Sequence, residues 1–392
     1  MKHRVTRRLA LSTIVLFVGV GAGRAALAQF PPPEKTELAS PIVEVAMDLS
    51  NRLPIVEARV NGQGPFRFLV DTGLSTVFLI DDEIATQLKL RILGRSQMRD
   101  GSGIDSQTVT IVRADSISMG EAVFSNCFGV IFDLDSFPKD FRLDGVIGFP
   151  AFKDCVLTLD YPRNRLILQP PSITDNSDSQ WLKYTLFQGS PEIAISIAEV
   201  SVHAIVDSGS TGTIVAESFE KKIPFHAEPI TVGMASRATG MFTRREARAK
   251  GEIKLGSVSV SEPIVQIYGT ETWLGYDLLQ YFSITFDQKN QRLRFTRSDS
   301  SPIVFPPLCY AGFGALPGDG GREVEYVLPQ SPAQRAGLRT GDLITAVNGK
   351  PAGAYDNPAW WALFEKPRRL SIVLNRGEET ITVSVDVVVA VP

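Results

Sequence analysis

Short apolar runs separated by Gly, Asn and Asp fill most of the chain from about Pro41 onward. Ile55 to Val60 and Phe66 to Val70 are two such runs, with Asn61-Gly62-Gln63-Gly64 between them. Runs of about four to eight β-branched and aromatic residues, bounded by turn formers, are typical of β-strands. The pattern therefore predicts a mainly β protein.

Three segments depart from this strand pattern. Asp81 to Leu90 reads as a short helix, because its acidic residues stand at the positive N-terminal end. Ser331 to Leu338 has a Ser cap, a Pro in the first turn and a Gly stop, which also predicts a short helix. Pro358 to Phe364 is expected to form a second helix of the same unit. Strands at Leu370–Asn375 and Thr380–Val387 follow it.

The chain repeats its plan. An apolar run that ends in Asp, then Thr or Ser, then Gly occurs at Phe68–Ser75 and again at Ala204–Thr211. In both copies the Gly of a hairpin turn, Gly120 or Gly256, lies 49 positions after this Asp. A strand-ending Asp then lies 12 positions after a later Gly, Asp160 after Gly148 and Asp287 after Gly275. Equal spacings predict an internal duplication. The first copy carries nine extra residues between Ile131 and Asp144, which we expect to form a surface insertion with its tip at 137–140.

The first 28 residues have the pattern of a secretory signal. A basic start precedes the apolar segment Leu9–Gly21, and Ala26-Leu27-Ala28 has the small-x-small form of a cleavage site. The sequence thus predicts export, to a bacterial periplasm or to the medium. Removing the leader changes the formal charge from -3 to -8, which argues against nucleic acid as a partner. No later apolar segment reaches the roughly 20 residues that a membrane span requires.

Shifts in composition divide the chain into units. The first linker is polar and poor in apolar residues, and the arm after the leader is rich in Pro. The predicted order is a signal peptide (1–28), a flexible arm (29–40), a first lobe (41–171), a linker (172–180), a second lobe (181–297), a linker (298–307) and a third unit (308–392).

Several kinds of chemistry lack the residues they need. After the leader the chain has two histidines, His203 and His226, and no Cys-x-x-Cys, His-Glu-x-x-His or glycine-rich phosphate loop. We therefore predict no metal and no cofactor. His203 lies in an apolar strand and is read as structural rather than as a catalytic base. Cys127 and Cys155 could form a disulfide in an oxidising compartment, or remain buried thiols like Cys309, and the sequence leaves both open.

The two repeated carboxylates suggest a different chemistry. If the repeats pack about a pseudo-twofold axis, Asp71 and Asp207 face each other across it. Two carboxyl groups at such a short distance share one proton and titrate as a pair. The charged member can then take a proton from a water molecule while the protonated member polarises a carbonyl group. This arrangement would hydrolyse an amide.

The residues beside each Asp suit this arrangement. The hydroxyl groups of Thr72 and Ser208 can brace the two turns across the axis. Gly73 and Gly209 allow close approach of the backbone, whose N–H groups can then serve as donors. We therefore place these residues in supporting roles around the two carboxylates.

The motifs carry a resemblance to a known family. Residues Ile55–Leu168 and Trp181–Phe295 resemble a tandem pair of retropepsin-like aspartyl protease repeats, fused as in the pepsin-like arrangement. The motifs that carry it are Leu69–Gly73, Ile205–Gly209, Val146–Gly148 and Trp273–Gly275. The resemblance implies two pseudo-twofold-related β-barrel lobes with Asp71 and Asp207 as catalytic residues. Position alone indicates flaps at Gly101, Ser102 and Gly103 and at Thr239 and Gly240.

The third unit resembles a PDZ domain of the kind attached to exported bacterial proteases. Its candidate carboxylate-binding loop is formed by Gly312, Phe313, Gly314 and Ala315. Such domains bind a chain terminus by adding it as a strand to a sheet edge, while backbone N–H groups hold the carboxylate. A packing module that binds nothing is the alternative.

These observations predict an exported aspartic endopeptidase whose PDZ-like domain recruits a polypeptide substrate or partner protein. A monomer suffices for a dyad within one chain. One alternative is a non-catalytic peptide-binding scaffold that acts through the PDZ-like domain. Another is that each half pairs with a second molecule.

Overall fold

A computed structural model describes residues 31–99, 106–134, 142–171, 180–237 and 240–392. Several of the predicted features lie outside these residues: the signal peptide, most of the linker 172–180, the insertion tip, and the candidate flap residues Gly101, Ser102, Gly103 and Thr239. Within the described residues, no helix is both long and apolar enough to cross a membrane.

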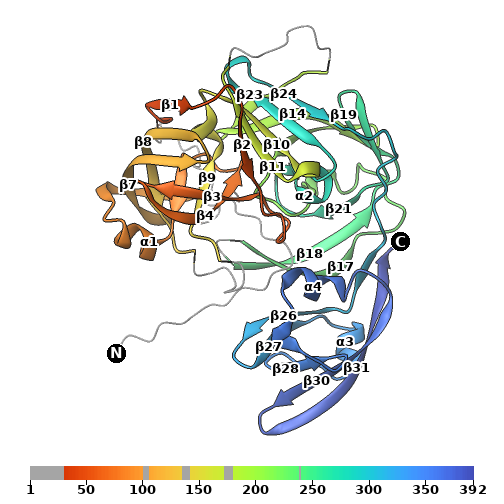
Figure 1. Ribbon diagram of the computed structural model, residues 1–392. Coiled ribbons are helices and arrows are strands. Elements are labelled where there is room, and N and C mark those ends of the chain that lie inside the picture. The colour runs from red at the N-terminus through yellow and green to blue at the C-terminus, as the bar shows by residue number, and fades with distance from the viewer. Residues whose placement is uncertain (1–30, 100–105, 135–141, 172–179, 238–239) are drawn as a thin grey trace.

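The fold is mainly β, as the sequence predicts, with barrel-like sheets followed by a PDZ domain (Figure 1). Most strands of the first half form one sheet. Its strands in spatial order are β1 (Lys35–Leu38), β8 (Ala122–Ile131), β5 (Phe78–Ile80), β9 (Gly145–Gly148), β4 (Gln63–Asp71), β3 (Ile55–Val60), β7 (Ser106–Met119) and β6 (Arg91–Arg99). Strand β8 also pairs with β7, which curls the sheet toward a barrel.

The second half builds a comparable sheet. Its strands in spatial order are β17 (Ile230–Arg237), β18 (Gly240–Arg248), β21 (Ile264–Ile267), β16 (Ile214–Val215), β22 (Thr272–Leu274), β15 (Val200–Val206), β14 (Ser190–Ile197), β19 (Glu252–Leu255) and β20 (Val258–Ser261), with β13 (Thr185–Phe187) on β14. In both sheets the strand before the repeated Asp is parallel to its neighbour, β4 with β9 and β15 with β22. The neighbour is antiparallel to the strand after the Asp turn, β5 or β16. The halves thus share a local topology.

A third sheet joins the halves. Its strands in spatial order are β12 (Leu182–Lys183), β24 (Arg292–Thr296), β23 (Ser283–Asp287), β10 (Val156–Asp160), β11 (Arg165–Gln169) and β2 (Val43–Ala46). Strand β10 of the first half pairs antiparallel with its counterpart β23. The hydroxyl groups of Thr158 and Thr285 meet there, 3.0 Å apart, at facing positions of the two strands. This sheet therefore fixes the two halves relative to each other.

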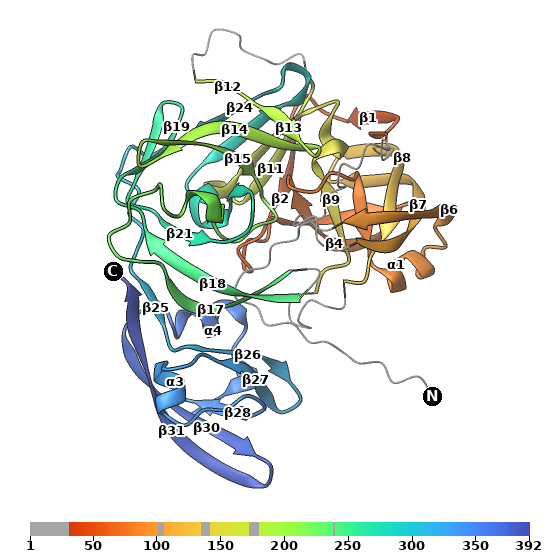
Figure 2. The same ribbon diagram turned by 180° about the vertical axis from the view of Figure 1, so that it is seen from behind.

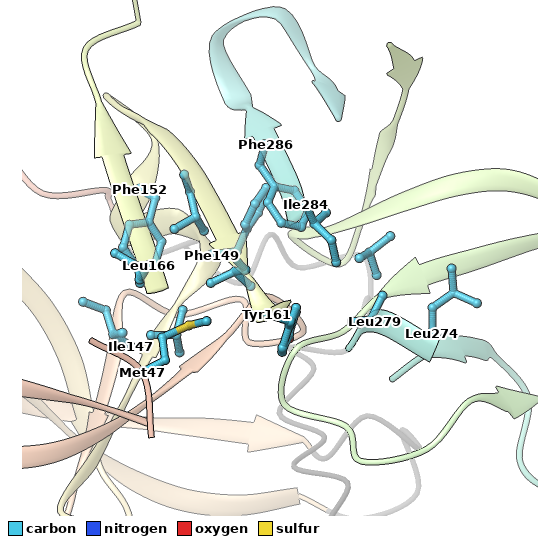
Figure 3. Close-up of a cluster of buried hydrophobic side chains, with 14 of the residues drawn as sticks. Met47, Ile147, Phe149, Phe152, Tyr161, Leu166, Leu274, Leu279, Ile284 and Phe286 are labelled. Carbon is cyan, nitrogen blue, oxygen red and sulfur yellow. The ribbon is translucent and has the colours of Figure 1, made fainter. Parts of the chain in front are cut away.

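One apolar core runs through both halves. Apolar side chains from the joining sheet and from both barrel-like sheets belong to a single buried cluster. Figure 3 shows Phe149 of the first half beside Phe286 of the second. The rings of Phe149 and Phe286 meet edge to face with centroids 5.4 Å apart. Since these rings come from different halves, separating the halves would expose them to water.

The PDZ domain forms its own sheet and core. Its strands in spatial order are β25 (Leu308–Tyr310), β31 (Glu379–Val391), β30 (Arg368–Arg376), β28 (Leu343–Val347), β27 (Gly321–Val327) and β26 (Phe313–Gly318), with β29 (Lys350–Pro351) on β28. Figures 1 and 2 place this blue domain beside the second half, below the hairpin β17–β18. The chain ends at Pro392, whose carbonyl oxygen accepts a hydrogen bond from Arg248 of β18.

The predicted helices form and begin where their N-caps indicate, but they end two or three residues before the predicted ends. In α1 (Asp82–Gln87), the Asp81 carboxylate accepts hydrogen bonds from the first turn. In α3 (Pro332–Arg335), the Ser331 hydroxyl accepts from the backbone of Gln334. The second PDZ helix, α4 (Asn357–Ala362), begins one residue earlier than predicted, because Asp356 caps it through the Ala359 backbone N–H. A further short helix, α2 (Tyr276–Leu279), follows Gly275.

Two segments expected to be connectors take part in the fold. Lys35–Leu38, within the arm expected to be flexible, forms β1 and pairs with β8, so that β1 is the last strand at this end of the sheet. In the linker 298–307, Ile303 and Phe305 are buried, and the guanidinium of Arg248 donates to the Phe305 carbonyl at 3.0 Å. The linker therefore packs on the second half.

The cysteines are free thiols. Cys127, Cys155 and Cys309 are all buried, and none is paired. Burial raises the pKa of Cys127 and of Cys155 to about 12, so both remain protonated at neutral pH. Of the two arrangements that the sequence leaves open, the structure has the buried thiols rather than the disulfide.

We expect Phe286→Ala to destabilise the protein by about 3–5 kcal/mol, because it leaves a cavity where the halves meet. Urea unfolding followed by circular dichroism measures the change. Val304→Ala is the control, since this side chain is 73% exposed and its loss should alter the free energy of unfolding by less than about 0.5 kcal/mol. Equal stability of the two variants would contradict the assignment of a shared core.

Candidate active site

Each repeated Asp lies at the end of a buried strand. In β4 the residues before Asp71, Phe68 to Val70, have no exposed surface, and in β15 the residues before Asp207, Ala204 to Val206, are equally buried. Each strand is held on one side by a parallel partner, with Asp71 opposite Gly148 in β9. An apolar strand fixed in a sheet gives its last side chain a rigid position. The sequence thereby places one carboxylate at the end of each lobe's central strand.

The two Asp turns are tied to each other by reciprocal hydrogen bonds. The Thr72 hydroxyl donates to the Val206 carbonyl at 2.6 Å and accepts from the Ser208 backbone N–H at 3.0 Å. The Ser208 hydroxyl donates to the Val70 carbonyl at 2.7 Å and accepts from the Thr72 backbone N–H at 2.9 Å. All four groups are buried, where an unmade hydrogen bond is costly. The hydroxyl groups thus hold the turns at a fixed separation.

Glycine after Thr72 and after Ser208 permits this close approach. A Cβ atom on Gly73 would lie 2.6 Å from the Asp207 Oδ1 atom, and one on Gly209 would lie 2.5 Å from the Asp71 Cγ atom. Neither distance is possible between real atoms, so any larger residue would push the carboxyl groups apart. Each glycine packs against the carboxyl group of the opposite lobe, which makes this part of the site symmetric.

The carboxyl groups have the same local hydrogen bonds. The Gly73 backbone N–H donates to the Asp71 Oδ1 atom at 2.7 Å, and the Gly209 N–H donates to the Asp207 Oδ1 atom at 2.8 Å. Both aspartates are fully buried, and apart from the facing carboxyl group neither Oδ2 atom has a hydrogen-bond partner among the residues that the structure describes. One oxygen of each carboxyl group is therefore fixed by the protein, and the other can hold a proton or accept one.

Burial dominates the acidity of the pair. It raises the pKa of Asp71 well above its usual range, and the facing Asp207 carboxylate raises it further. Burial also raises the pKa of Asp207 to about 6, although hydrogen bonds from Asp71 and from backbone N–H groups oppose this shift. Two buried carboxyl groups in contact cannot both ionise easily, so they titrate as a unit. Near neutral pH the pair can hold one proton, which suits general acid–base chemistry.

Three further residues, which were not predicted from the sequence, support the site. The Ser190 hydroxyl on β14 donates to the Gly73 carbonyl at 2.8 Å and adds another bond between the lobes. The Asp277 carboxylate accepts from the Thr213 backbone N–H at 2.8 Å, which fixes the loop after Asp207. Tyr161 is buried close enough to both aspartates for their charges to raise its pKa, after the larger effect of burial. Asp277 lies two residues after Gly275, so its position beside this motif could have marked it as a site residue.

The other candidate residues lie apart from the dyad. Of the predicted flap residues, Gly240 is described, and it begins β18 opposite Arg237. The loop Gly312–Ala315 belongs to the PDZ domain. His203, which the sequence analysis read as structural rather than as a catalytic base, has a ring that is 67% exposed and lies 3.4 Å from the Glu192 carboxylate. His226 is also exposed and contacts Glu262.

Comparison with known proteins agrees with this division. Residues 56–151 match the family described as aspartyl protease, and residues 323–359 match the PDZ domain. The first match contains Asp71 and ends before Asp207. The chain therefore combines an aspartyl-protease-like domain with a C-terminal PDZ domain.

A relative is similar over a shorter stretch. The chain is 32% identical over 110 residues, or 27% of its length, to a Synechocystis sp. protein, HhoA, whose name describes it as a serine protease. This stretch is 24% of that protein. The chain thus spans about a quarter of the length of the curated relative that it matches.

The raised pKa values predict a pH-dependent stability. Both carboxyl groups bind protons more tightly in the folded chain, so their contribution is complete below about pH 4 and is lost as the pH rises through the folded-state pKa of each group, which is about 6 for Asp207. Asp207→Asn removes one titration. Its free energy of unfolding should rise relative to the wild type between pH 4 and pH 7.5, by up to about 3 kcal/mol. Urea unfolding at both pH values measures this, and Asp154→Asn, at an exposed position, should show no such trend.

Proposed function

We propose that this chain is an aspartic endopeptidase that hydrolyses peptide bonds with water activated between Asp71 and Asp207. The observation that carries the proposal is the reciprocal bonding of Thr72 and Ser208, which holds two buried carboxyl groups face to face. Buried like charges are costly, and a purely structural site would not need two of them in contact. The match to the aspartyl protease family supports the same chemistry.

The proposed reaction uses one proton shared by the dyad. The ionised carboxylate takes a proton from a water molecule as the water oxygen attacks the substrate carbonyl carbon. The protonated carboxyl group donates its proton to the carbonyl oxygen, which gives a neutral tetrahedral diol. Collapse of the diol returns a proton to one carboxylate, and the departing amine takes the proton from the other. Both carboxyl groups then have their starting charges, and no covalent enzyme intermediate forms.

We propose further that the halves are tandem repeats in the pepsin-like arrangement. The shared strand topology and the pairing of β10 with β23 support this, because each repeat supplies one Asp turn to a common axis. A dyad completed within one chain requires only a monomer. The flap residues predicted from the sequence, Gly101–Gly103 with Thr239 and Gly240, belong to the same proposal.

Serine chemistry, which the name of the relative suggests, has less support in this chain. A serine nucleophile ordinarily needs an adjacent base, most often histidine. In the part of the chain that the structure describes, His203 and His226 are both exposed and contact the carboxylates of Glu192 and Glu262. Neither is placed to activate a serine near the Asp turns.

A scaffold that binds without cutting would have no use for the paired carboxyl groups.

Replacing either carboxyl group should abolish cleavage. Asp71→Asn and Asp207→Asn remove the shared proton while nearly preserving shape, so cleavage of a denatured protein should fall by a factor of about a thousand or more. The assay is digestion of unfolded casein by the mature protein between pH 4 and 7, resolved by mass spectrometry. Asp154→Asn serves as the matched control and should retain full activity. Undiminished activity of either dyad variant would refute the proposal.

A further inference from the structure

The PDZ domain contacts the first lobe through its helix α4. The Asn357 side chain at the start of α4 donates to the Asn51 side-chain oxygen at 3.1 Å, and both residues are buried. Beside this hydrogen bond, the Arg52 guanidinium lies 5.1 Å from the Trp361 ring centroid and 3.3 Å from the Glu365 carboxylate. Separating a buried amide pair is costly, because each group loses its partner. The contact therefore holds α4 at a defined place on the first lobe.

That place lies next to the strand that carries Asp71. Pro54 follows three positions after Asn51 in the chain. Its carbonyl oxygen accepts a hydrogen bond of 2.9 Å from the backbone N–H of Val70, the residue before Asp71 in β4. The segment that α4 contacts is thus bonded directly to the strand of the first carboxyl group.

The second contact is with the outer strand of the hairpin β17–β18. Met234 of β17 packs against a buried PDZ cluster that includes Leu316 and Tyr326. A Cβ atom on Gly233 would lie 3.1 Å from the Tyr326 hydroxyl oxygen, so this side chain rests against the backbone of β17. Figures 1 and 2 show the PDZ domain beside this hairpin in both views. The hairpin is therefore supported from the side of the PDZ domain.

The same hairpin supports the loop that follows Asp207. Strand β18 pairs with β21, where Glu246 faces Gln266. The Gln266 backbone N–H donates to the Thr213 carbonyl at 2.9 Å. A Cβ atom on Gly212 would lie 2.1 Å from the Gln266 Nε2 atom, so only glycine leaves room for this amide group. The strand next to β18 thus fixes the loop after the second carboxyl group.

The two contacts are separate from each other. Residues of both contacts line a cavity of about 630 Å³, among them Asn51 and Arg52 of the first and Tyr326 of the second. The cavity also reaches Thr211, four residues after Asp207. A domain attached at one place could tilt about it, whereas attachment at two places around a cavity prevents this motion.

We propose that the PDZ domain is a brace for the catalytic unit, attached through Asn357 and Met234, that holds the Asp71 strand and the loop after Asp207 at a fixed separation. Both attachment residues are positioning residues, since each acts through the segment that it contacts and not on the substrate. The brace belongs to the chain itself and needs no peptide bound to the PDZ domain. It rests on the proposed function, because the groups that it aligns are the proposed dyad.

The dyad should respond strongly to a loose brace. Misplacement of catalytic groups by about 1 Å can lower a rate by about a hundredfold. The loss should fall on kcat rather than on KM, because alignment of the carboxyl groups is needed in the transition state. Carboxyl groups that are held less tightly together are also less strongly coupled, so the two apparent pKa values of the pH profile should move closer together.

The kinetic test uses the full-length protein and a short peptide that is acetylated and amidated, so that no free terminus can be recognised. Asn357→Ala and Met234→Ala should each lower kcat by about fivefold or more and change KM by less than about twofold. A brace fails when either end is released, so the double variant should lose at most about twofold more. Two controls should retain the wild-type kcat: Met234→Leu, which keeps the apolar contact, and Glu378→Ala, at an exposed position in the turn between β30 and β31.

The brace is also tested without any measurement of activity. Hydrogen exchange of the backbone N–H groups of Val70 and Gln266 reports on the two segments that the brace holds. Each of the two Ala variants should speed exchange at both positions by about fivefold or more, because the two attachments act together. Glu378→Ala should change neither rate.

Two results overturn the proposal. Wild-type kcat, pH profile and exchange rates in both Ala variants would show that the PDZ domain is attached without bracing the lobes. An equal loss of kcat in Met234→Leu and Met234→Ala would show that the apolar contact is not what matters. Thermal melts establish that each variant is folded, and Met234→Ala keeps the experiment decisive if Asn357→Ala unfolds the PDZ domain.

Failure of the proposed function has a different signature. If the wild type cleaves nothing while exchange at Val70 and Gln266 still responds to both Ala variants, the aspartic peptidase is wrong and the brace stands. If the wild type cleaves the blocked peptide and neither Ala variant alters kcat or exchange, the peptidase stands and the brace is wrong.

Discussion

The structure depends on keeping two carboxyl groups in contact inside a protein. Asp71 and Asp207 are both fully buried, and burial alone raises the pKa of each. Left to themselves, such groups would separate or draw in water. The reciprocal bonds of Thr72 and Ser208 prevent this, because each hydroxyl group donates to one lobe and accepts from the other lobe's turn. The energetic cost of the pair is met by the packing around it.

That packing explains the architecture. The three residues before each Asp are buried, and the joining sheet pairs β10 with β23 so that neither lobe can shift alone. Edge-to-face contact between Phe149 and Phe286 continues the core across the boundary. The Ser190 hydroxyl adds a bond from β14 to the first Asp turn. A site that needs sub-ångström placement is thus built on strands rather than on loops.

Much of this could be predicted from the sequence, and the limits have physical reasons. The Asp turns, the helix caps at Asp81 and Ser331, and the strand β10 are encoded in contiguous residues, so local pattern reveals them. The Ser190 hydrogen bond and the cavity beside the PDZ domain each involve segments far apart in the chain, and no sequence spacing predicts either of them. The exposed ring of His203 follows from the alternation along β15, which points every second side chain outward, and the sequence analysis had assigned it a structural role without placing it inside or outside.

The central claim is that the two aspartates act as one unit. A double-mutant cycle tests it most directly, with kcat/KM measured for the wild type, Asp71→Asn, Asp207→Asn and the double variant on one peptide substrate. Groups that share a proton are strongly non-additive, so the double variant should be no more than about threefold worse than either single variant. Losses that multiply, with each single variant retaining substantial activity, would contradict the account.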